Sequence, residues 1–216
     1  MTMAHPDRSA DASLERDAFE QAAAWFRTVV DRVEHWDDPG LGEWTVRDLV
    51  GHTSRSLVTV ETYLDADPGD VTLPSAVAYY EAVVAALTSG SAGSPQEVAE
   101  RGRAAARALG ADPAGHLRDL DARTQAKVAA AADDAFVGTP FGGMRLVDYL
   151  PTRTFELVVH TGDLAHAEGL EASPPDVALA SALRLAADLA RVRGHGMAVL
   201  HALTGRRPLR DGFSLV

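Results

Sequence analysis

Apolar residues recur along most of the chain at the three- and four-residue spacing of amphipathic helices. Short clusters of glycine, proline, serine and aspartate separate these stretches. The pattern predicts helices over about 13–34, 45–65, 75–87, 95–132, 146–168 and 174–203, the fourth of them interrupted between residues 110 and 115. Residues 136–146 mix apolar side chains with several glycines, which favours one small hairpin.

Long helices with short connections are typical of an antiparallel bundle, so we expect an all-α protein. Residues 1–12 are expected to form a flexible lead-in and residues 13–172 the bundle itself. Residues 173–216 are expected to add a C-terminal helix and tail that pack on the bundle.

Composition and charge narrow the class of protein. The 216 residues are 46% hydrophobic and 24% charged, which is typical of a globular chain rather than a disordered one. The formal net charge of -11 argues against nucleic acid as a partner, because phosphate binding needs a concentrated basic surface. No apolar run approaches the ~20 residues that span a bilayer, and the N-terminal residues are too polar for a signal peptide. We therefore expect a cytoplasmic protein without a membrane partner.

The absence of cysteine restricts the chemistry that the chain can perform. A protein with no cysteine has no disulfide, no thiolate ligand and no thiol nucleophile of its own. Any metal site must be built from histidine, aspartate and glutamate side chains.

The helix predicted from residue 146 to 168 carries the most informative pattern. It is apolar on nearly every side and should therefore lie inside the bundle. One of its seams nevertheless places Arg153, Glu156, His160 and Asp163 at alternating spacings of three and four. Burying unpaired charges costs several kcal/mol each, so these side chains need partners or a cation.

Glu156 and His160 lie about one helical turn apart, so their polar ends can converge on one divalent ion. His52 is the best third donor, because it lies beside the apolar stripe of the second helix and follows Gly51, which permits a close approach. Two histidines and one glutamate suit zinc and leave a coordination position open, as in catalytic rather than structural sites.

Other interpretations of the same residues remain open at this point. Arg153 could instead pair with Glu156 in a buried ion pair without metal, and Asp163 could serve only to orient His160. His52 taken alone is more often a hydrogen-bonded histidine than a ligand, and Trp44 is expected to anchor the core ahead of its helix.

Two motifs carry a resemblance to a known family: WTVRDLVGH over residues 44–52 and RTFELVVHTGDLAHAEG over residues 153–169. Together they resemble the metal-binding domain of mycothiol-dependent maleylpyruvate isomerases, which is similar to the DinB/YfiT-like superfamily. The resemblance implies a DinB-like antiparallel four-helix bundle with additional short helices. It also implies that His52, Glu156 and His160 are the zinc ligands. From their places on the same seam, we expect Arg153 and Asp163 to lie around these ligands.

The function that the resemblance implies is compatible with a chain that has no cysteine. The nucleophile would be a low-molecular-weight thiol, mycothiol, and its partner a small electrophile that is isomerised or receives the sulfur. The lack of isoleucine and asparagine and the single lysine fit a GC-rich actinobacterial source, where that thiol is expected. The isomerases have a fuller C-terminal domain, whereas little more than one helix and a tail follow Ser173 here, so S-transfer is as compatible as isomerisation.

Two further points stay open in the sequence. The alternative function is a non-catalytic helical bundle that binds a metal or a small ligand in the same pocket. A homodimer is compatible with a bundle of this size, but no exposed stripe assigns an interface.

Overall fold

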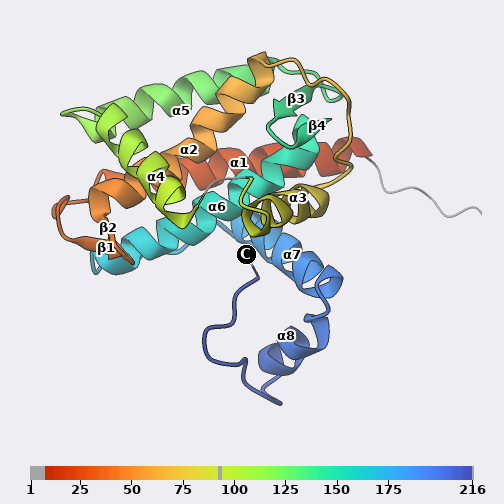
Figure 1. The fold of residues 1–216 in the computed structure, drawn as a ribbon. Coiled ribbons are helices and arrows are strands. Elements are labelled where there is room, and N and C mark those ends of the chain that lie inside the picture. The colour runs from red at the N-terminus through yellow and green to blue at the C-terminus, as the bar shows by residue number, and fades with distance from the viewer. Residues whose placement is uncertain (1–7, 92–93, 216) are drawn as a thin grey trace, which may run out of the picture.

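The computed structural model describes residues 8–91 and 94–215, and it contains eight helices and two short hairpins within those ranges (Figure 1). The elements are α1 (Arg8–Val30), β1 (Pro39–Leu41), β2 (Trp44–Thr45), α2 (Val46–Asp65), α3 (Ala76–Thr88), α4 (Pro95–Ala108), α5 (Pro113–Ala130), β3 (Phe136–Thr139), β4 (Gly142–Arg145), α6 (Leu146–Ala167), α7 (Asp176–Val192) and α8 (Gly196–Leu203). The predicted helical bundle is confirmed.

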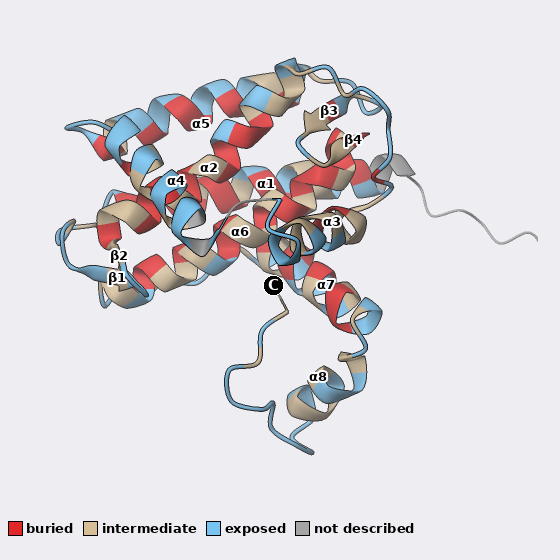
Figure 2. Ribbon diagram, viewed as in Figure 1, coloured by how far each residue is buried: buried red, intermediate tan, exposed pale blue. Residues whose placement is uncertain are grey.

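Helix α6 runs through the middle of the molecule and packs against α1, α2, α3 and α7 (Figure 1). Its side chains Tyr149, Leu150, Leu157 and Leu164 are fully buried, as the sequence predicts for a helix inside the bundle. Among its apolar side chains Val159 is the exposed one, at 39%. Buried residues follow the inward faces of the surrounding helices, whereas α8 has none (Figure 2).

The start of α2 is fixed by a capping box, as its sequence predicts. The Thr45 hydroxyl accepts a hydrogen bond from the Asp48 amide at 3.2 Å, and the Asp48 carboxylate accepts one from the Thr45 amide at 3.2 Å. The backbone amides of Thr45 and Asp48 thus both have hydrogen-bond acceptors. This capping sets where α2 begins and therefore the position of His52 along it.

Gly51 permits the close approach that the sequence suggests. A Cβ atom built at this position would lie 2.3 Å from the backbone nitrogen of Ala106, so α4 packs against the bare backbone of α2. The α2–α4 contact closes one wall beside His52.

The structure corrects several predicted boundaries. Helix α1 ends at Val30 rather than near residue 34, and the chain then forms a hairpin, β1–β2, that the pattern did not predict. The predicted last helix is two helices, because Gly194 adopts a φ of 74° after the end of α7. The other hairpin, β3–β4, lies where one was expected.

Residues 1–7 of the expected lead-in lie outside the described residues, and α1 begins at Arg8, ahead of the predicted start. Among the described helices, none combines the length and the apolarity that a membrane crossing requires.

Candidate functional site

Helices α2 and α6 bring three side chains from distant parts of the sequence to one place. His52 comes from α2, Glu156 and His160 come from α6, and one ligand atom of each lies within 4.8 Å of the others. All three are partly buried, so the cluster is neither sealed in the core nor loose in solvent. The predicted convergence of these three side chains is what the geometry shows; their role as metal ligands stays a prediction.

Glu156 and His160 face each other across one turn of α6, as their spacing predicts. The Nε2 atom of His160 lies 3.2 Å from Oε2 of Glu156. The Nδ1 atom of the same ring lies 3.2 Å from Oδ2 of Asp163. His160 is therefore held between two carboxylates, and Asp163 occupies the orienting position that the sequence suggested for it.

Tyr80 of α3 completes the surroundings of Glu156, and no sequence pattern predicted its role. Its hydroxyl donates a 2.6 Å hydrogen bond to Oε1 of Glu156. Only 3% of Tyr80 is exposed, and its ring meets that of Phe155 edge to face. A tyrosine in the apolar run of a short helix carries no pattern that points to a site 76 residues further along the chain.

His52 is positioned by aromatic contacts rather than by a hydrogen bond to another described residue. The ring of Trp44 lies 4.5 Å from the ring of His52, centroid to centroid, and the ring of His160 approaches edge-on at 4.9 Å. Trp44 was expected to anchor the core; it is partly buried and packs against the core, and it also borders the site. Gly102 of α4 lies behind the Trp44 ring. A Cβ atom built at this position would lie 3.1 Å from the indole.

Arg153 does not form the ion pair with Glu156 that the metal-free alternative requires. Its guanidinium lies over the rings of Tyr149 and Tyr79, at 5.1 and 5.5 Å, and its Nε donates to the Thr152 hydroxyl at 2.9 Å. No carboxylate of the described residues lies within ion-pair distance of it. Arg153 is thus a cation beside the cluster, held by aromatic rings.

The protonation states of the three side chains follow from these contacts. Burial, and next the positive charge of His160, lower the pKa of His52 from 6.5 to about 4, so its ring is neutral at pH 7. Burial alone would lower the pKa of His160, but the hydrogen bonds to Asp163 and Glu156 outweigh it and raise the value to about 9. Burial would raise the pKa of Glu156, but the His160 hydrogen bond and the Arg153 charge lower it to about 2.

The donor set fits a divalent metal ion. Imidazole nitrogens and a carboxylate oxygen are ordinary zinc ligands, and histidine ligands usually donate their second N–H to a carboxylate, as His160 does to Asp163. Tyr80 likewise takes up one oxygen of Glu156 and leaves the other facing His160. We therefore regard His52, Glu156 and His160 as a candidate metal site.

Comparison with known families decides the classification. A family model described as the mycothiol maleylpyruvate isomerase N-terminal domain matches residues 15–165, which is more than half of the chain. The chain belongs to this family. The matched range of the mycothiol maleylpyruvate isomerase N-terminal domain includes all three candidate ligands and Tyr80, whereas α7 and α8 lie beyond it. Comparisons with curated proteins and with solved structures gave no match.

Proposed function

We propose that this protein is a metal-dependent enzyme that uses mycothiol to isomerise a small electrophile or to transfer sulfur to it. The observation that carries the proposal is the three-residue cluster of His52, Glu156 and His160, partly open to solvent, in a chain of this family that has no cysteine. A divalent ion held there, zinc by the chemistry of the ligands, would lower the pKa of a thiol and supply a thiolate near neutral pH. A cytoplasmic location is part of the proposal, because thiols stay reduced there.

The other roles at the site belong to residues of the chain itself. His52 is neutral at pH 7 and ready to act as a donor, while Asp163 and Tyr80 hold His160 and Glu156 in place. These fixed contacts restrict the ligand side chains before any substrate enters, so less ordering is needed when the site is used.

Arg153 is proposed to orient the electrophile. No carboxylate of the described residues forms a direct ion pair with it, and its guanidinium is fixed by the stacking on Tyr149 and Tyr79. An anionic group on the electrophile would supply the missing partner and bring the reacting carbon near the thiol.

The test is the rate of mycothiol-dependent reaction by zinc-loaded protein. Maleylpyruvate serves as the isomerisation probe and 1-chloro-2,4-dinitrobenzene as the S-transfer probe. We expect one of them to react at least 100-fold faster with wild-type protein than with His52→Ala, because loss of one ligand removes the activated thiol. The matched control is His166→Ala, since His166 is exposed on the same helix and outside the cluster. A wild-type rate equal to that of His52→Ala with both probes would favour the non-catalytic binding module.

A further inference from the structure

The C-terminal arm, which we define as residues 196–215, leaves apolar side chains uncovered. It consists of α8 and the tail that follows, and α8 has no buried residue. Met197, Leu200 and Leu203 are 61%, 51% and 79% exposed. Among the described elements, α7 is the only one that α8 contacts to more than a marginal extent. Helix α8 projects below the bundle (Figures 1 and 2). An exposed apolar surface of this kind marks an interaction site.

The arm is held in shape by contacts with the residues that follow α7 and by one within the arm. The ring of Phe213 meets the ring of His195 edge-on at 5.4 Å, and the Arg193 guanidinium donates to the carbonyl oxygen of Leu215. The Arg206 amide also donates to the carbonyl oxygen of His201 at 2.8 Å. These contacts present the apolar residues of α8 on a preformed surface, which lowers the ordering cost of docking.

The charge of the arm is opposite to that of the rest of the chain. It contains three exposed arginines, Arg206, Arg207 and Arg210, against one acidic residue, Asp211, which gives a formal charge of +2. Because the whole chain carries -11, the remainder carries -13. Two arms therefore repel each other, whereas an arm and the body of a second copy attract.

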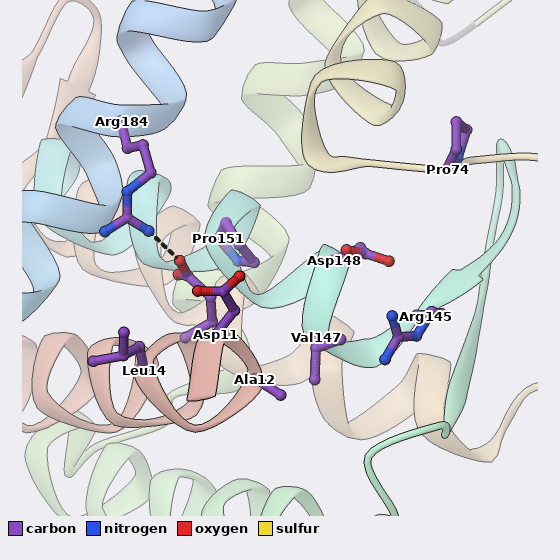
Figure 3. A pocket seen from close by; sticks show the side chains of 10 residues that line it. Asp11, Ala12, Leu14, Pro74, Arg145, Val147, Asp148, Pro151 and Arg184 are labelled. Atoms are coloured by element: carbon purple, nitrogen blue, oxygen red, sulfur yellow. Dashed lines mark hydrogen bonds and ion pairs between the residues drawn. The ribbon is translucent and has the colours of Figure 1, made fainter. Parts of the chain in front are cut away.

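A cleft in the body offers the matching surface. It has a volume of about 700 Å³ and lies between the starts of α1 and α6, the middle of α7 and the chain before α3 (Figure 3). Its apolar lining consists of Ala12, Leu14, Pro74, Val147 and Pro151, and its charged lining of Asp11, Glu15, Asp148, Arg145 and Arg184. Arg184 is already paired with Glu15 at 2.7 Å. Leu14 is 49% exposed there, whereas Ala12 and Val147 are buried. The lining carries three carboxylates against two guanidinium groups, and Asp11 is exposed.

We propose that the arm of one chain docks into this cleft on a second copy, and that the two copies exchange arms reciprocally. The leucines of α8 would cover Leu14 and the apolar lining around it, and the arginines of the tail would meet the exposed carboxylate of Asp11. The arm does not cover the cleft of its own chain, since the apolar residues of α8 remain exposed and α8 makes at most marginal contact with α1 and α6. A reciprocal exchange satisfies both clefts and both arms and closes as a twofold dimer.

The experiment is sedimentation equilibrium of the full chain, with the dimer dissociation constant as the readout. We expect Leu203→Glu and Asp11→Arg each to raise the constant at least tenfold, and added salt to raise it as well. Both residues are exposed in the single chain, so neither change should unfold it. Leu87→Glu is the matched control, because Leu87 is 44% exposed on α3 and lies outside the arm and the cleft.

A charge reversal distinguishes this contact from other uses of the arm. Replacing Arg206 and Arg207 by glutamate should weaken the dimer, and adding Asp11→Arg to the same chain should restore it. A wild-type chain that stays monomeric at all concentrations would overturn the proposal. So would a dimer that the arm variants leave unchanged, or a monomer whose arm instead binds vesicles of phosphatidylserine and phosphatidylcholine.

Discussion

At the scale of single residues, His160 and Glu156 are arranged alike. In each, one polar atom is hydrogen-bonded to another side chain, and the second polar atom faces the other residue. Asp163 holds Nδ1 of His160, and Tyr80 holds Oε1 of Glu156. The remaining atoms, Nε2 of His160 and Oε2 of Glu156, lie 3.2 Å apart. A cation that replaces the shared proton between them finds both donors already oriented.

Removing the Tyr80 hydroxyl should weaken the candidate site without dismantling it. We expect Tyr80→Phe to lower zinc affinity about 10- to 100-fold, because Glu156 loses the hydrogen bond that fixes its carboxylate. Tyr79→Phe is the matched control: Tyr79 is also buried on α3 but has no hydrogen bond to a ligand. Competition with a chromophoric chelator measures both affinities, and equal values for Tyr80→Phe and wild type would contradict the positioning role.

The metal-free protein should lose stability in alkaline solution. The pKa of His160 is raised from 6.5 to about 9, so its contribution to the free energy of unfolding is complete below pH 6.5 and disappears as the pH rises through 9. Urea denaturation in the presence of chelator should show this loss between pH 7 and 10. His160→Gln should flatten it; the same slope in both proteins would show that another group is responsible.

The pKa of His52 predicts an opposite trend on the acid side. It is lowered from 6.5 to about 4, so the folded state resists its protonation and stability falls as the pH drops from 6.5 through 4. An NMR titration of the metal-free protein should separate the two rings, with His52 titrating well below His160. Titration of both near 6.5 would contradict the described contacts.

At the scale of elements, the sequence predicted α2 and α6 well because their signals are local. The capping box fixes where α2 begins, and the apolar periodicity shows that α6 is central. The β1–β2 hairpin and the break at Gly194 escaped prediction, because short turns carry few residues and a helical pattern continues across them. Tyr80 and Trp44 escaped as site residues because only tertiary packing brings them to the cluster.

The contact between α2 and α4 depends on the missing side chain at Gly51. A Cβ there would lie 2.3 Å from Ala106 backbone, so Gly51→Ala should destabilise the protein by about 1–3 kcal/mol despite the better helix propensity of alanine. Gly162→Ala is the control on α6: nothing lies within 4 Å of its added Cβ, and we expect a gain of up to about 1 kcal/mol. Urea denaturation of both variants tests this, and an unchanged or raised stability for Gly51→Ala would contradict the close packing.

At the scale of the whole molecule, two distant sequence motifs meet because α2 and α6 are neighbours in the bundle, with His52 opposite Glu156 and His160. The family match ends at residue 165, so α7 and the C-terminal arm lie outside the matched domain. The bundle accounts for the candidate metal site, and the arm accounts for the proposed contact between copies.

The most direct test of the account is zinc binding by the chelator-treated protein, measured by titration calorimetry and by metal analysis after dialysis. We predict one zinc ion per chain, an affinity loss of at least 100-fold in His52→Ala, Glu156→Ala and His160→Ala, and no loss in His166→Ala. Wild-type zinc affinity in each of the three single variants would contradict the candidate metal site. So would a wild-type chain that retains no divalent metal after reconstitution.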